Sequence, residues 1–144
     1  MANFPKSPVL LLSCLTLASA SAVAADRVTV DDTDYVIGNV LKCEPHRVDG
    51  MRFELELQGL HRQGDVRGQI DVLVQSIGSM RVHDVSWSGP EGTFSFEGMP
   101  NEELFMEENG RVWGRVMLED AYGGDETVTI DFDLGVPDAT FGCR

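Results

Sequence analysis

Apolar and polar residues alternate along most of the chain after residue 26. The clearest run is residues 51–58, MRFELELQ, in which every odd position is apolar and every even position is polar. A period of two is typical of a β-strand that buries one face and exposes the other. Such runs predict strands over residues 27–30, 35–42, 51–58, 69–75, 80–87, 93–97, 112–118 and 127–134, with a last piece over 139–143.

Turn-forming residues separate these runs. Gly, Asn, Asp and Pro gather in residues 31–34, 47–50, 64–65, 89–92, 109–110 and 123–125. These residue types supply the positive or fixed φ angles that tight turns need. Short strands with such turns predict an all-β fold, either an antiparallel β-sandwich or a small barrel of about eight to nine strands.

One strand interrupts its own alternation. Val82 cannot share a face with Val85 and Trp87 unless the strand contains an extra residue. We therefore expect a β-bulge at His83 and Asp84.

A single segment has helical character. Asn101 can cap a short helix over residues 102–108, in which acids follow the cap and Gly110 ends the helix. This helix is expected to depend on the sheet because it is too short to be stable alone.

The apolar positions of the strands are enough to fill the interior of one domain over residues 26–144, with one disulfide as reinforcement. The expected core consists of Tyr35, Ile37, Phe53, Leu55, Leu57, Ile70, Val72, Val82, Phe94, Phe96, Val116, Val128, Ile130 and Phe132.

Residues 1–25 resemble an export signal peptide. Lys6 precedes an apolar run over residues 9–17, and small residues follow, so cleavage is expected after Ala24 or Ala25. The apolar run is too short for a transmembrane helix, which needs roughly 20 apolar residues. A second reading is lipidation at Cys14, because residues 11–14, LLSC, have the order of a bacterial lipoprotein cleavage box.

Two cysteines, Cys43 and Cys143, remain after removal of this signal. In an oxidising compartment an even pair is most simply a disulfide. Two free thiols are the alternative, and a redox-active pair lacks the Cys-x-x-Cys spacing it would need.

The chain carries 24 acidic and 11 basic residues, which gives a net charge of −13. Phosphate binding depends on clustered Lys and Arg, so this composition excludes nucleic acid and anionic lipid headgroups as partners. The acidic surface instead favours a cationic protein or envelope partner through electrostatic steering.

No residue pattern indicates a catalytic centre, a metal site or a cofactor. The three histidines, His46, His61 and His83, lack a metal-ligand spacing and are expected on the surface. There is no Gly-x-Ser-x-Gly nucleophile motif. Two alternatives stay open: calcium at an acidic loop in residues 31–34, 102–108 or 119–126, and a hydrolase whose two carboxyls face each other across a cleft.

The order of motifs resembles the mycobacterial nineteen-kilodalton lipoprotein antigen family. The resemblance rests on the opening VTVD of residues 28–31, the glycine-interrupted strand over 35–43, VWGRV at 112–116, the late strand over 129–132 and a cysteine close to the C-terminus. It implies an exported, non-enzymatic envelope domain, which is our leading functional hypothesis. The chain departs from the family because Cys14 lies inside the apolar signal, and residues 135–140 intervene before Cys143.

A second resemblance is to periplasmic lysozyme inhibitors, which are small exported barrels with a disulfide from an early strand to the C-terminus. It implies that a loop of Ser88, Gly89, Pro90, Glu91 and Gly92 enters the cleft of a cationic hydrolase such as lysozyme. Here Gly92 stands where the family's loop has Tyr. Both resemblances place the protein outside the cytoplasm of a bacterium, in the periplasm, the envelope or the medium.

Overall fold

The computed structural model of the chain describes residues 23–45, 47–48, 51–77, 79–97, 106–108 and 110–142. All regular structure in these residues is β-strand, which confirms the all-β class. The strands are β1 (Arg27–Val30), β2 (Thr33–Val36), β3 (Asn39–Cys43), β4 (Arg47–Val48), β5 (Met51–Gln63), β6 (Val66–Ile77), β7 (Ser79–Gly89), β8 (Gly92–Glu97), β9 (Met106–Glu108), β10 (Arg111–Asp120), β11 (Thr127–Gly135) and β12 (Thr140–Phe141).

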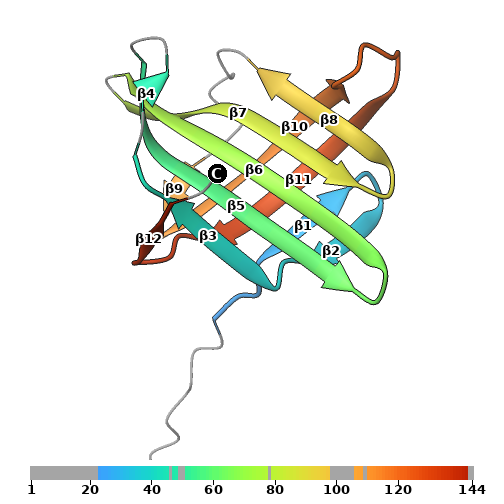
Figure 1. Cartoon of the computed structure of the whole chain (residues 1–144), viewed down its shortest axis with the longest axis horizontal. Coiled ribbons are helices and arrows are strands. Elements are labelled where there is room, and N and C mark those ends of the chain that lie inside the picture. Colours follow the sequence, from blue (N-terminus) through green and yellow to red (C-terminus); the bar gives the residue numbers. More distant parts are fainter. Residues whose placement is uncertain are drawn as a thin grey trace, which may run out of the picture.

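Ten strands follow one another in a single mixed sheet, in the order β12-β3-β5-β6-β7-β8-β10-β11-β1-β2. β4 and β9 lie off this path and pair with β5 and β10. Neighbouring strands are antiparallel except β12 and β3, which run parallel. Figure 1 shows β5, β6 and β7 crossing over β10, β11 and β1.

One hydrophobic core lies between these two groups of strands. Every second residue of β10 and β11 is buried, and the same alternation continues through β5, β6 and β7. The two groups meet directly, because a Cβ added to Gly59 of β5 would lie 3.6 Å from Leu134 of β11. The pattern of alternation therefore sends each strand's apolar face to a common interior.

The expected core is largely confirmed. Eleven of its members are buried: Tyr35, Ile37, Leu55, Leu57, Ile70, Val72, Phe94, Val116, Val128, Ile130 and Phe132. Phe96 is partly buried, and the side chains of Phe53 and Val82 lie outside the described residues. The prediction omitted several buried residues: Trp87, Val28, Val30, Val74, Val85, Val112, Leu118 and Leu134.

The predicted bulge in β7 is confirmed. Leu73 pairs with Asp84, whereas the next residue, Val74, pairs with Val82, so His83 is the extra residue. A second shift, between Phe53 and Leu55 of β5, was not foreseen, because that run alternates perfectly in sequence.

The predicted helix over residues 102–108 is wrong in its last part. Met106–Glu108 is strand β9, whose Glu108 pairs with Arg111 across a tight turn at Gly110. Gly110 has a φ of 73°, which suits a hairpin turn. The Asn-Gly turn signal thus prevailed over the weak helical pattern, and residues 101–105 lie outside the described residues.

The predicted strand over residues 35–42 is divided at Ile37 and Gly38, so that β2 pairs with β1 and β3 pairs with β5. Near the other end of the chain, Phe141 of β12 pairs with Cys43, and its carbonyl accepts a hydrogen bond from the backbone N–H of Glu44 at 2.9 Å. β12 therefore lies beside the strand that carries Cys43.

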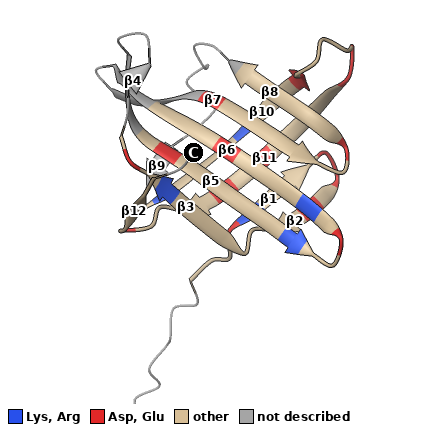
Figure 2. Cartoon of the chain, in the orientation of Figure 1, with Lys and Arg blue, Asp and Glu red and all other residues tan. Residues whose placement is uncertain are grey.

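Charged residues are spread over the strands and the turns (Figure 2), and no Lys, Arg, Asp or Glu among the described residues is buried. Among the described residues, Arg62 and Arg67 pair next to the β5–β6 turn, and Arg27, Arg111 and Arg115 lie on β1 and β10. No helix in the described residues is long and apolar enough to span a membrane.

Candidate functional site

Several predicted site residues cannot be placed. Cys14, His46 and Cys143 lie outside the described residues, as does the side chain of His83. Cys43 is placed, and it is buried at the end of β3.

The loop assigned to hydrolase inhibition is the tight β7–β8 hairpin. Gly89 pairs with Gly92, and Pro90 and Glu91 form the turn between them. The hydroxyls of Ser88 and Thr93 hydrogen-bond across the two strands at 3.1 Å. Inhibition through this loop stays a prediction.

Glu91 of this turn is held by two aromatic residues of the interior. The Tyr35 hydroxyl donates a hydrogen bond to Oε1 of Glu91, and the Trp87 indole N–H donates to Oε2 at 3.1 Å. Both carboxylate oxygens are therefore occupied by the protein's own donors. This contact ties β2 to the β7–β8 hairpin.

Trp87 fills the core beneath this hairpin. Its ring leaves no room for a Cβ at Gly68 or Gly89, where an added atom would lie 2.3 Å and 2.6 Å from ring carbons. The Tyr35 and Trp87 ring centroids are 4.9 Å apart. Small residues at these two positions thus permit a fully buried indole.

His61 was expected on the surface, and this is wrong. The residue is only 8% exposed, and its ring meets that of Tyr35 edge-on at 5.1 Å. Its Nδ1 donates a hydrogen bond to the Val36 carbonyl at 2.7 Å. The Val36 carbonyl accepts the hydrogen bond of the ring N–H, and the Tyr35 ring packs against the imidazole. Burial of His61 therefore costs little free energy, because its N–H is not left unpaired.

The described acidic loops use their carboxylates to close turns. Asp120 accepts hydrogen bonds from the backbone N–H groups of Tyr122 and Gly124, at 2.8 Å and 3.2 Å. Asp31 accepts one from the N–H of Thr129 at 2.7 Å. No group of three or more potential metal ligands occurs in the part of the chain that the structure describes.

A small acidic pocket of about 140 Å³ lies on the outer face of β5, β6 and β7, between Glu56, Asp71 and Asp84. Burial raises the pKa of Asp71, although Gln69 donates a hydrogen bond to Oδ2 at 2.8 Å. The other oxygen, Oδ1, is buried and accepts no hydrogen bond. This carboxyl is accordingly less readily ionised than an exposed aspartate.

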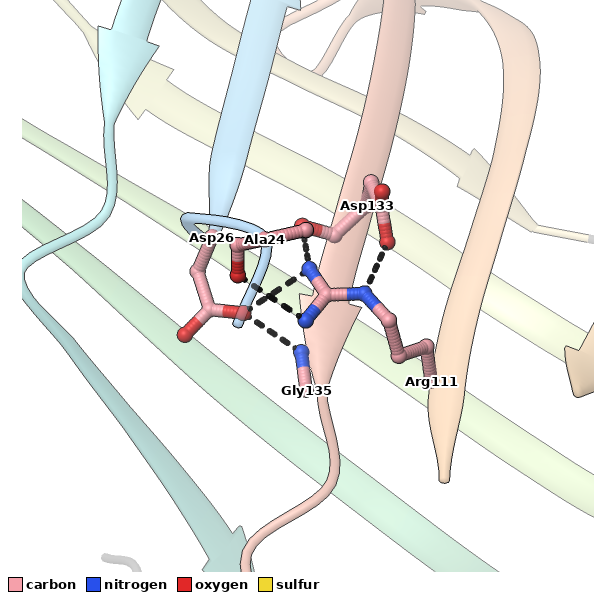
Figure 3. Close-up of polar contacts among 5 residues, drawn as sticks. All are labelled: Ala24, Asp26, Arg111, Asp133 and Gly135. Atoms are coloured by element: carbon pink, nitrogen blue, oxygen red, sulfur yellow. Dashed lines mark hydrogen bonds and ion pairs between the residues drawn. The ribbon is translucent and has the colours of Figure 1, made fainter. Parts of the chain in front are cut away.

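Arg111 organises the outer face of the opposite strands (Figure 3). Its Nε donates to Oδ1 of Asp133 at 2.7 Å, and Nη2 donates to Oδ1 of Asp26 at 3.1 Å. Nη1 also donates to the Ala24 carbonyl at 3.2 Å. The Asp26 carboxylate in turn accepts from the Gly135 N–H at 2.6 Å.

This network fixes the start of the domain. Asp26 precedes β1, whereas Arg111 and Asp133 belong to β10 and β11. The hydrogen bond that Arg111 donates to Asp133 raises the pKa of Arg111, and the nearby charge of Asp26 acts in the same direction. Charge-assisted hydrogen bonds of this kind are among the stronger polar contacts in proteins.

Next to this network is an open groove of about 460 Å³ on the outer face of β1, β10 and β11. We call it the Trp113 groove, and its lining includes Arg27, Thr29, Trp113, Arg115, Asp131 and Asp133. The strand register places these residues in two rows across the sheet. One row is Trp113, Asp133 and Arg27, and the other is Arg115, Asp131 and Thr29.

The groove combines an aromatic surface with charged groups. Trp113 is 41% exposed, in contrast to the fully buried Trp87. Arg115 and Asp131 make only a loose contact of 3.8 Å, and the Arg115 side chain is 72% exposed. Arg27 is exposed and forms no side-chain hydrogen bond or ion pair with any residue in the described ranges.

No family model, curated protein or solved structure matches the chain.

Sequence reasoning missed this groove. Alternation in residues 112–118 does place Trp113 and Arg115 on the polar face of a strand. A large aromatic residue at a polar position was the available signal. The proximity of Arg27 could not be read from the sequence, because it depends on β1 pairing with β11.

We expect Arg111→Gln to lower the free energy of unfolding by about 1–2 kcal/mol, since it leaves two carboxylates without their shared cation in a partly exposed setting. Urea denaturation followed by tryptophan fluorescence measures the change. Arg115→Gln is the matched control, because Arg115 lies four residues further along the same face of β10. Its effect should stay below about 0.5 kcal/mol. Equal losses in the two variants would contradict the role given to Arg111.

We expect Tyr35 to resist ionisation at alkaline pH. Burial, the hydrogen bond to Glu91 and the charge of Glu91 together raise its pKa from 10.0 to about 12, with burial the largest of the three causes. The neutral phenol thus stabilises the folded state fully below pH 10, and this contribution is lost as the pH rises towards 12.

Tyrosinate absorbance checks this expectation, with the titration of Tyr35→Phe subtracted from that of the wild type. The difference curve should have its midpoint at about 12 in the folded protein and near 10 in denaturant. A midpoint near 10 under both conditions would show that the phenol is not held by Glu91.

Proposed function

We propose that the chain is a non-enzymatic, exported β-domain that binds a ligand in the Trp113 groove. The observation that carries the proposal is this open groove, in which a partly exposed indole lies between arginines on a paired sheet. Binding sites commonly combine an aromatic surface with a few well-placed polar groups. Strands that are hydrogen-bonded on both sides hold such groups in place without a further cost of ordering.

The groove has features of recognition more than of catalysis. Its two carboxylates, Asp131 and Asp133, each face an arginine, Arg115 and Arg111 respectively. A general acid must carry a proton, and Asp133, which accepts a hydrogen bond from the Arg111 guanidinium at 2.7 Å, is poorly suited to that role, so Asp131 lacks a partner in the groove for acid–base catalysis by a carboxyl pair. The buried Tyr35 and His61 lie elsewhere, and their polar groups bind Glu91 and the Val36 carbonyl, respectively.

Export and the disulfide form part of the same proposal. The β12–β3 pairing supports a Cys43–Cys143 bridge, because Phe141, two residues before Cys143, lies beside Cys43. A bridge over this long loop would restrict the unfolded chain. We further propose that the sheet closes into a small barrel rather than a sandwich. The supporting contacts are the bond from the Gly38 N–H to the Leu60 carbonyl, at 2.9 Å, and that from His61 to Val36.

Mass spectrometry of the protein recovered from separated envelope and periplasmic fractions tests these points together. We expect a mature chain that begins at residue 25 or 26, lacks an acyl group on Cys14 and has the two-hydrogen loss of one disulfide. Hydrogen exchange on the same sample should show a slow Gly38 amide, as closure requires. An intact signal, an acylated Cys14, two free thiols or a freely exchanging Gly38 would each refute the corresponding part.

Binding in the groove is tested by acrylamide quenching of tryptophan fluorescence. Only Trp113 should be quenched, because Trp87 is 0% exposed. We expect at least one fraction of envelope material, separated into glycan, protein and lipid, to protect Trp113 from acrylamide. The variant Trp87→Phe, which leaves Trp113 as the sole tryptophan, confirms that the quenched fluorescence comes from Trp113.

Two results would oppose the proposal. If no fraction protects Trp113, the groove is not a binding site for envelope material. If a protecting fraction is recovered cleaved, as judged by its mass, the groove is catalytic and the domain is an enzyme.

A further inference from the structure

The arginines of the Trp113 groove differ in what they already bind. Arg111 donates to two carboxylates and two carbonyl oxygens, which leaves it little capacity for a ligand. Arg27, in contrast, makes no side-chain polar contact within the described ranges, and Asp133, directly opposite it in the register, is bound to Arg111 at 2.7 Å. Arg27 therefore offers an unsatisfied guanidinium next to a satisfied carboxylate.

Trp113 lies in the same cross-strand row as Arg27, on the other side of Asp133. Two strand spacings separate the two backbones, a distance of roughly 10 Å. Both side chains are long, so they can contact one compact ligand that lies over Asp133. Such a ligand would place a flat apolar face on the indole and an anionic group on Arg27.

The second row supplies acceptors and a further cation. Arg115 is mostly exposed, Asp131 is about half exposed, and the two are only loosely paired at 3.8 Å, so each has free positions for hydrogen bonds. The groove thus presents one aromatic face, two available guanidiniums and carboxylate oxygens within one open depression. A ring with an apolar C–H face, a rim of hydroxyls and a carboxylate uses all three kinds of group.

Other ligands use these groups less well. A polyanion such as nucleic acid would meet the repulsion of a chain with a net charge of −13. A purely apolar ligand would leave the charged rows of the groove desolvated and unpaired. A single carboxylate on a neutral scaffold avoids both costs.

We propose that the Trp113 groove binds an acidic saccharide, with a sugar ring stacked on Trp113 and its carboxylate held by Arg27 and Arg115. This inference rests on the proposed binding function of the groove and adds the chemical class of the ligand.

The test uses galacturonic acid, a sugar with a single carboxylate, as the probe and its methyl ester as the neutral match. Affinity is measured by calorimetry on the protein recovered after export, and protection of Trp113 from acrylamide is followed in parallel. We expect the acid to bind and to protect Trp113, with an affinity that falls as salt is raised. We expect the ester to bind about ten-fold more weakly or not at all, because it cannot accept charge-assisted bonds.

Variants separate the two contacts. Arg27→Gln should weaken binding of the acid about ten-fold while leaving that of the ester unchanged. Trp113→Ala should abolish binding of both. Matched controls are Arg67→Gln, an exposed arginine near the β5–β6 turn, and Tyr122→Ala, an exposed aromatic residue in the β10–β11 turn. Neither control should change the affinity, and urea midpoints verify that each variant folds.

The outcomes test separately whether the ligand is an acidic saccharide and whether the Trp113 groove binds a ligand at all. Equal binding of acid and ester, still dependent on Trp113, would overturn acid recognition and leave a saccharide groove. If neither saccharide protects Trp113 while an envelope protein or lipid fraction does, the ligand class is wrong and the binding function stands. If nothing protects Trp113, both proposals fail.

Discussion

The common interior of the sheet is the constraint on which the rest of this structure depends. Each long strand sends alternate residues into one core, and Trp87 and Leu57 are among the side chains that fill it completely. Chemistry that needs solvent must then use the outward positions, the turns or the ends of strands. The polar residues that do enter, Tyr35 and His61, are paired with internal acceptors and so serve the packing of the core. The Trp113 groove follows from the same constraint, since it occupies the outer face.

Alternation predicted most of the strands because its physical cause, one buried and one wet face, acts residue by residue along the chain. The bulge at His83 was predictable for the same reason: the phase of Val82 and Val85 cannot be reconciled without an extra residue. The segment at Met106–Glu108 shows where local reasoning fails. Its acids and cap favour a helix locally, but pairing with Arg111–Asp120 supplies backbone hydrogen bonds that a short isolated helix cannot match.

Burial at the ends of strands was harder to predict than burial in their middle. Trp87 lies three residues beyond the bulge, and its burial depends on two glycines, Gly68 and Gly89, from different positions in the sheet. His61 was misplaced because its partner, the Val36 carbonyl, belongs to a strand 25 residues away. The candidate groove was missed for the same reason. Trp113 and Arg27 are 86 positions apart and become neighbours only through β11, so no local pattern could have joined them.

Charge takes on a different meaning once the fold is known. A net charge of −13 describes the whole surface, and by itself it favours cationic partners. The sheet nevertheless brings Arg27, Arg111 and Arg115 together on one face, where Asp26, Asp131 and Asp133 balance them. Arg111 forms ion pairs with Asp26 and Asp133. Asp133, which lies opposite Arg27, is therefore already paired with Arg111. A locally neutral face on which Arg27 has no side-chain partner among the described residues can accept a small anionic ligand that the remaining surface would repel. The hydrogen bonds of Arg111 to Asp26 and Asp133 thus both fix the strands and allow the neighbouring groove to bind a carboxylate.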